Sequence, residues 1–193
     1  MTDVSSSASS LPGRLAIAAH LDDRGFRLVL HPQPEVLHHG VVRASVLAFV
    51  VDAVAGILVD EDPEVWALTT DLTLRMRPVA APDHVTAHCE VLRRGRRSVT
   101  ASVDLVDDGG ALVAQSAIGF AAIPRRDGDP PKPDIGPADA SRIFTGRSAL
   151  TDPLVEAAGI RVLDPDAGVA ELLVTPELRN PADGELVDKA LVL

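Results

Sequence analysis

The sequence contains few cysteines and few aromatic residues, and each shortage narrows the kinds of protein that it can encode. Cys89 is its single cysteine, which excludes an internal disulfide framework and any cysteine-rich zinc or iron–sulfur site. Aromatic residues make up 3% of the 193 residues, with one Trp and no Tyr. Because 46% of the residues are nevertheless hydrophobic, the chain can bury a sizeable core, which must be aliphatic.

Positive charge is also scarce, since 18 Lys and Arg stand against 28 Asp and Glu and give a net charge of −10. Proteins that bind nucleic acid or anionic membranes need a basic surface, so this balance argues against both. Residues 1–10 are rich in serine and lack the apolar stretch of a secretory signal, and we interpret them as a flexible leader. These features predict a cytoplasmic protein. The length predicts one domain, or one domain and part of a second.

The longest apolar run, residues 41–59, predicts a helix. A helix of that length would be roughly 28 Å long, close to the thickness of a bilayer core. However, Arg43 and Asp52 lie inside the run, and its flanks carry no aromatic or basic anchors. A helix that is apolar on all sides is otherwise buried in a protein core, and this is the interpretation that we adopt.

Alternating and apolar patterns predict strands on both sides of this helix. Two short strands, 14–20 and 26–30, flank an Asp-Gly turn before it. Three long strands follow it, at 66–76, 85–91 and 99–105, and a last one spans 112–123. In the first of these, strict alternation predicts one face made of Leu68, Thr70, Leu72, Leu74 and Met76. The fold class is therefore α+β, with an antiparallel sheet wrapped around one long central helix.

The C-terminal third begins with a proline-rich stretch at residues 124–137, which is typical of a linker. Beyond it we expect a short helix at 152–158, with Asp152 as its N-cap, and strands at 160–163 and 169–174. Residues 164–184 resemble residues 22–40, with Pro176 and Gly184 falling on Pro32 and Gly40. We predict a leader (1–10), a main domain (11–124), a linker (125–150) and a partial second copy of that domain (151–193).

Several short motifs follow one another in a recognisable order. They are Gly40, Asp52, Thr69-Thr70-Asp71-Leu72, Arg77-Pro78, Gly95-Arg96 and Asp108-Gly109-Gly110. Together with the order of elements, they resemble the hotdog-fold acyl-CoA thioesterases of the phenylacetate-pathway type over residues 14–124. The repeat resembles the tandem double-hotdog members of that group, here with an incomplete second unit.

The resemblance implies hydrolysis of an acyl-CoA to a free acid and coenzyme A, without a metal or other cofactor, by a homodimer or larger homo-oligomer. It implies that Asp52 is the general base or nucleophile and that Thr69 orients water. Backbone amides at the helix start would bind the oxyanion. The implied catalytic residues are Asp52, Ser45 and Thr69, and the implied substrate-binding residues are Gly40, Arg43, Ala44, Arg94 and Arg96. Arg94 and Arg96 belong to a basic turn at 93–97 that could bind the phosphates of coenzyme A.

Other interpretations remain open at this level. Arg43-Ala44-Ser45 stands where the family has His-Gly-Gly, which favours a non-catalytic acyl-CoA-binding module or a decayed paralogue. Asp52 could instead be a structural acid, for example at a subunit interface. A hotdog hydratase would need a His–Asp pair, and His38 and His39 lack the required spacing. The histidines are more typical of a surface than of a metal site, because no carboxylate or thiol joins them at ligand spacing.

Overall fold

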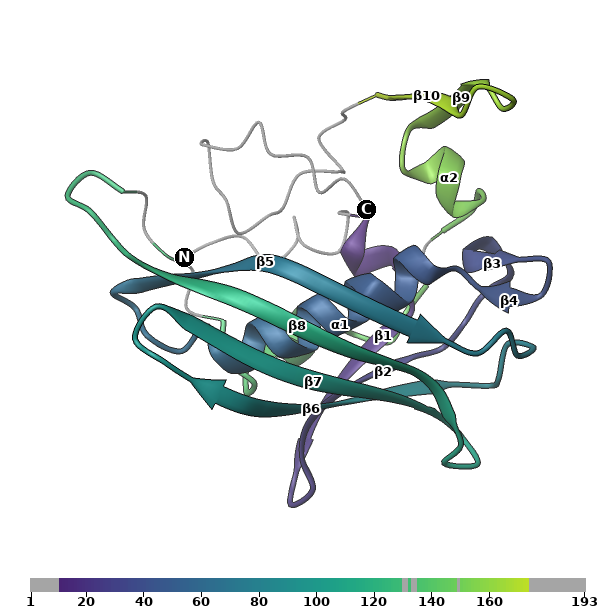
Figure 1. Cartoon of the computed structure of the whole chain (residues 1–193). Coiled ribbons are helices and arrows are strands. Elements are labelled where there is room, and N and C mark those ends of the chain that lie inside the picture. The colour runs from purple at the N-terminus through teal and green to yellow at the C-terminus, as the bar shows by residue number, and fades with distance from the viewer. Residues whose placement is uncertain (1–10, 130–131, 133–134, 149, 174–193) are drawn as a thin grey trace.

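The computed structural model describes residues 11–129, 132, 135–148 and 150–173. Within them, six antiparallel strands form one sheet in the order β1-β2-β6-β7-β8-β5, which curves around the helix α1 (Figure 1). The strands are β1 (Ile17–Asp22), β2 (Gly25–Leu30), β5 (Val65–Met76), β6 (Val85–Arg94), β7 (Ser98–Asp107) and β8 (Leu112–Pro124), and α1 spans Ala44–Val59. The predicted α+β fold, a large antiparallel sheet around one long helix, is confirmed.

The aliphatic composition explains why α1 lies inside the sheet. Its sheet-facing residues Val46, Leu47, Val50, Val51 and Val54 are at most 1% exposed. They pack on the inward side chains of the strands, which include Leu28, Ala87, Val103, Leu105 and Ile118. Burying each Val or Leu side chain contributes about 1.5–3 kcal/mol, so the packing of α1 against the sheet is a major source of the stability of the fold. Among the described helices, none is long and apolar enough to cross a membrane.

The helix begins three residues later than the apolar run. Val41 and Val42 form β4 (Val41–Val42), which pairs with β3 (Leu37–His38) in a small hairpin. The loop residues His39 and Gly40 both have positive φ, 51° and 75°, which is the geometry of a tight two-residue hairpin turn. This turn directs Arg43 into the N-cap position, so that Ala44 is the first helical residue.

The alternation predicted for residues 66–76 is wrong in its first half. In β5, Thr69 pairs with Phe120 and Asp71 pairs with Gly119, so Thr70 is an extra residue in a β-bulge. For the residues of β5 that precede the bulge, the inward and outward faces are exchanged. The Leu68 side chain therefore points outward and is 46% exposed. Thr69 points inward instead, on the same face as Leu72. The alternation predicted for β6 and β7 is confirmed, since their predicted inward residues are the buried or half-buried ones.

The two edges of the sheet differ. The outer edge of β1 is partly covered, because Ala19 donates to the carbonyl of Phe144 and Gly146 donates to that of Ile17. The ring of Phe144 packs near Phe49 of α1, with centroids 6.4 Å apart. In contrast, the 12-residue strand β5 pairs with β8 on one side, and no described strand pairs with its other side.

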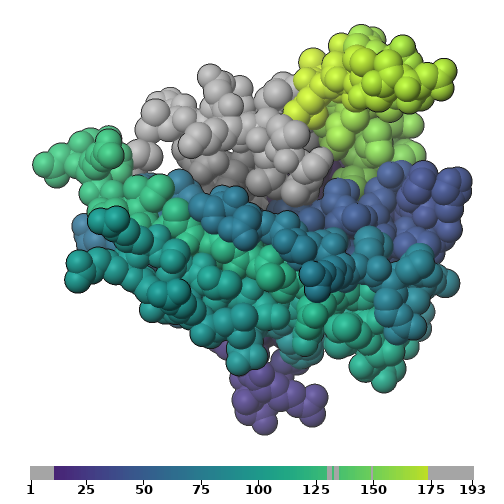
Figure 2. Space-filling model, viewed as in Figure 1, coloured from purple at the N-terminus to yellow at the C-terminus, as the bar shows by residue number. Residues whose placement is uncertain are grey.

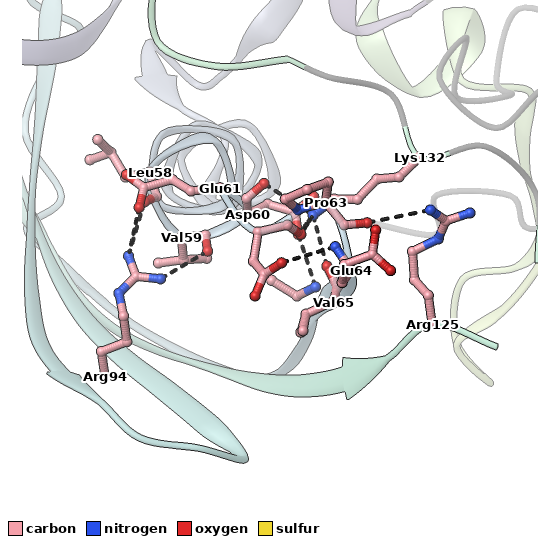
Figure 3. A network of polar contacts seen from close by, with 12 residues as sticks. Leu58, Val59, Asp60, Glu61, Pro63, Glu64, Val65, Arg94, Arg125 and Lys132 are labelled. Carbon is pink, nitrogen blue, oxygen red and sulfur yellow. Dashed lines mark hydrogen bonds and ion pairs between the residues drawn. The ribbon is translucent and has the colours of Figure 1, made fainter.

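The described part of the predicted linker is bound to the main domain through the loop that joins α1 to β5. The Lys132 ammonium donates to the carbonyls of Asp60, Asp62 and Val65 at 3.1, 2.7 and 2.7 Å, and it lies 2.8 Å from the Asp60 carboxylate (Figure 3). Its side chain is only 4% exposed. Arg125 donates to the carbonyl of Pro63 in the same loop. The domain boundaries themselves stay a prediction.

Beyond this segment lie the 3-10 turn η4 (Ala140–Arg142), the helix α2 (Leu154–Ala157) and the hairpin of β9 (Ile160–Asp164) and β10 (Val169–Leu172). Asp152 is not the cap of α2, because Pro153 holds the N-cap position. Figures 1 and 2 show that α2 and the hairpin project from the body at the end of α1 that adjoins β3 and β4. The leader (1–10) and residues 174–193 lie outside the described residues.

Candidate active site

Asp52 and Thr69 form the most distinctive polar pair of the domain. Asp52 lies on α1, and its Oδ1 accepts a hydrogen bond of 2.6 Å from Oγ1 of Thr69 on β5. The bulge at Thr70 makes this contact possible, because it turns Thr69 toward the helix. Burial raises the pKa of the Asp52 carboxyl, whereas the Thr69 hydrogen bond acts in the opposite direction. The pair combines a partly desolvated carboxyl group with an exposed hydroxyl at the open edge of the sheet.

We expect Thr69 to control the ionisation of Asp52. The hydroxyl stabilises the carboxylate form, so Thr69→Val should raise the pKa of Asp52 further. Thr69→Ser keeps the donor and should leave this pKa unchanged. The measurement is the NMR titration of the Asp52 carboxyl in the wild type and both variants. The same pKa in all three would refute this role.

The start of α1 carries three of the predicted residues. Arg43 is the N-cap residue, and its carbonyl accepts hydrogen bonds from Val46 and Leu47. Among the described residues, nothing accepts from the backbone amides of Ala44 and Ser45, so both are free donors at the positive end of the helix. Ser45 lies on the same face as Asp52 but about 10 Å away along the axis. Gly40, in the β3–β4 turn, accepts from the amide of Ala81 and so anchors the following loop.

The two predicted arginines of the basic turn lie elsewhere. Arg94 donates to the carbonyls of Val59 and Leu58 at 3.1 and 3.3 Å, at the C-terminal end of α1 (Figure 3). A cation there complements the unpaired carbonyls of the last helical turn. Arg96 is exposed in the turn between β6 and β7. Because α1 has 16 residues, about 24 Å separates Arg94 from the residues at the helix start.

A pocket of about 300 Å³ opens beside the start of α1. Its walls come from three segments that are far apart in the chain, so the sequence by itself does not reveal it. They are Leu11, Pro12 and Leu15; Arg43, Ser45, Val46 and Phe49; and Leu154, Val155, Ala158, Ile160, Ala170, Glu171 and Leu172. Most of these side chains are apolar. The only signal in the sequence was the alternation of apolar residues in the C-terminal hairpin.

In the described part of the chain, the cysteine and the histidines do not form a second site. Burial raises the pKa of the Cys89 thiol to about 11, so it stays protonated and weakly nucleophilic at neutral pH. His31 and His84 lie near one another, with ring centroids 6.1 Å apart. Across the described residues, no three His, Cys, Asp or Glu side chains come close enough together to bind a metal ion.

The fold built by these elements is the hotdog fold of the thioesterase superfamily. Residues 20–117, just over half of the chain, match the family described as the acyl-CoA thioesterase C-terminal domain, and the chain belongs to this family. Among curated proteins, none matched the sequence.

Solved structures show the same fold. A thioesterase from Haemophilus influenzae is 16% identical, with a TM-score of 0.54 over 61% of this chain and 85% of that one. A conserved protein from Pseudomonas aeruginosa is 20% identical, with a TM-score of 0.53 over 62% and 98%. A protein from Bacillus halodurans, solved with CoA, is 18% identical, with a TM-score of 0.50 over 54% and 71%. At these identities the likeness concerns the fold.

Proposed function

We propose that the protein is an acyl-CoA thioesterase, which hydrolyses an acyl-CoA to a free acid and coenzyme A. The observation that carries this proposal is the Asp52–Thr69 pair, a carboxyl with a raised pKa held by a hydroxyl at an accessible edge. Family membership and the CoA bound to the Bacillus halodurans protein support the substrate class.

In the proposed reaction, the Asp52 carboxylate takes a proton from a water molecule that attacks the thioester carbonyl. Thr69 holds the carboxylate in position. The carbonyl oxygen becomes an oxyanion, which backbone amides such as those of Ala44 and Ser45 would stabilise. When the intermediate collapses, the C–S bond breaks, the acid is released, and the coenzyme A thiolate takes the proton.

This reaction requires a second copy of the chain. The free amides of Ala44 and Ser45 lie about 10 Å from Asp52 along α1, so one thioester carbonyl cannot contact both groups within a chain. A second copy could bring its helix start to Asp52. The β5 edge, which no described strand covers, offers a surface for such pairing.

We therefore expect at least a dimer. Light scattering at micromolar concentration should give a mass of twice 20.3 kDa or more. A stable monomer would contradict both the dimer and the shared active site.

We also propose that residues 151–193 are a partial second hotdog unit, as in tandem double-hotdog proteins. The order of elements supports this. A short helical segment followed by an antiparallel hairpin occurs at η2 (Pro12–Arg14), β1 and β2, and again at α2, β9 and β10. The second pair of strands begins 143 and 144 residues after the first pair.

A second candidate function is acyl-CoA binding without hydrolysis. The observation that favours it is the Arg43-Ala44-Ser45 segment, which lacks the family's His-Gly-Gly at the helix start. Such a protein would bind acyl-CoA and leave the thioester intact.

A panel of acyl-CoAs of increasing chain length distinguishes the two functions. Thiol release is followed for hydrolysis, and calorimetry is used for binding. We expect release with aliphatic acyl-CoAs, because most of the side chains that line the pocket at the helix start are aliphatic. Binding without release would support the second function, and neither binding nor release would contradict both.

A further inference from the structure

The pocket beside the start of α1 combines an apolar interior with an arginine, Arg43. Within the described residues, no carboxylate or other acceptor bonds the side chain of Arg43, and its Nε atom is buried. A buried N–H donor of this kind is costly unless it finds an acceptor. Arg43 lines the pocket together with Ser45, so a ligand there could supply the acceptor.

Glu171, the other charged residue that lines the pocket, is not the acceptor for the Arg43 side chain. Glu171 on β10 pairs across the hairpin with Arg161 on β9, with 2.5 Å between their charged atoms. Its charge is therefore balanced within the hairpin. Among the described residues, no carboxylate forms such an ion pair with Arg43, which lies beside mostly apolar walls.

We propose that this pocket binds an aliphatic carboxylic acid, with the carboxylate on Arg43 and Ser45 and the chain against the apolar walls. A planar carboxylate matches the fork of a guanidinium group. A phosphate would need more hydrogen-bond donors than Arg43 and Ser45 provide. Moving its strongly hydrated charge into an apolar pocket would also be costly. The volume of about 300 Å³ lies at the lower end of the range for small-ligand sites.

The carboxylate could come from two sources. In the first, which we favour, it belongs to the free acid that thioester hydrolysis releases at the start of α1, and this assignment rests on the proposed function. In the second, it is the distal carboxylate of a dicarboxylic acyl group. Binding of the acid itself requires no turnover and can be tested without it.

The binding test compares octanoate with octanamide, which has the same shape without the charge, by calorimetry on the full chain. Octanoate should bind about 10- to 100-fold more tightly, the usual worth of charge-assisted hydrogen bonds. Arg43→Met should abolish that preference. The control Arg75→Met, which removes an exposed arginine on β5, should keep it.

A second variant makes the test independent of whether Arg43→Met folds. Ala170→Trp lies on the hairpin that forms the pocket wall, outside the main core, and should weaken both ligands at least tenfold by filling the pocket. Equal binding of octanoate and octanamide to the wild type would overturn the proposal. So would a charge preference that survives in Arg43→Met, or octanoate binding that is unaffected by Ala170→Trp.

Kinetics separate the two sources. If the acid is the product, octanoate should inhibit the hydrolysis of octanoyl-CoA in the wild type and about tenfold less in Arg43→Met. If Arg43→Met instead impairs only octanedioyl-CoA, the favoured source is wrong. Octanoate binding without any hydrolysis would contradict the thioesterase function and leave the pocket assignment standing. Hydrolysis of octanoyl-CoA without a preference for octanoate over octanamide would support the thioesterase function and contradict the pocket assignment.

Discussion

Asp52→Asn is expected to fold like the wild type and to hydrolyse acyl-CoA about 10²–10⁴-fold more slowly, the usual contribution of a positioned acid–base group. The amide has the shape of the carboxylate, and its oxygen can still accept the hydrogen bond from Thr69. It cannot accept a proton from water. The measurement is kcat and KM on the best substrate of the acyl-CoA panel, with Asp71→Asn as a control that removes an exposed carboxylate two residues after Thr69.

The same variant tests the raised pKa of Asp52 through its effect on stability. A carboxyl whose pKa is higher in the folded state favours folding when it is protonated, and this contribution is lost as pH rises above the unfolded value of about 4. The Tm of Asp52→Asn relative to the wild type should therefore increase between pH 4 and pH 7. A variant that weakens the dimer but keeps its activity per dimer would show instead that Asp52 is a structural acid of the interface.

Lys132→Met is expected to lower the free energy of unfolding by about 3 kcal/mol, because removing one partner of a buried ion pair leaves the other groups unsatisfied. The carbonyls of Asp60, Asp62 and Val65 would lose their donor, and the Asp60 carboxylate would lose its counter-charge. For a chain of this size, the loss corresponds to a fall in Tm of about 8 °C. Methionine keeps most of the side-chain volume, so packing changes little.

Two further variants show where this stability comes from. Arg126→Met removes an exposed charge from the same segment and should change Tm by less than about 1 °C. Asp60→Asn removes the ion pair but leaves the three carbonyl contacts of Lys132, so its effect should be smaller than that of Lys132→Met. An unchanged Tm in Lys132→Met would show that the linker does not hold the loop in solution.

Patterns within short windows of the sequence predicted most of the fold. The apolar run of residues 41–59 predicted α1, because a helix without a polar face must be buried. The alternation of residues 85–91 and 99–105 predicted the inward faces of β6 and β7. These signals are local, since a strand or helix in a core needs apolar residues at its own period.

The bulge in β5 could not be predicted in this way. The alternation continues without interruption through Thr69 and Thr70, so the sequence of the strand carries no mark of the extra residue. Its position depends on the partner strand. Gly119 of β8 lies opposite Asp71, where a Cβ atom would collide with the Asp71 carboxylate. Register is set by both strands together, and a shift of one residue exchanges the two faces.

Composition and periodicity by themselves determined the class of fold, the buried helix and the aliphatic core, and the resemblance of the motifs indicated Asp52 as the candidate acid. Tertiary structure alone decided which groups meet. In the folded chain, Thr69 points toward Asp52, and Arg94 caps the C-terminal end of α1. Lys132 binds the loop between α1 and β5, and the C-terminal hairpin lies beside Arg43. The physical reason is the distance along the chain over which each kind of information extends. Periodicity reflects the burial of a single element, whereas hydrogen bonds, ion pairs and pockets join residues far apart in the chain, and their partners are fixed only when the elements pack.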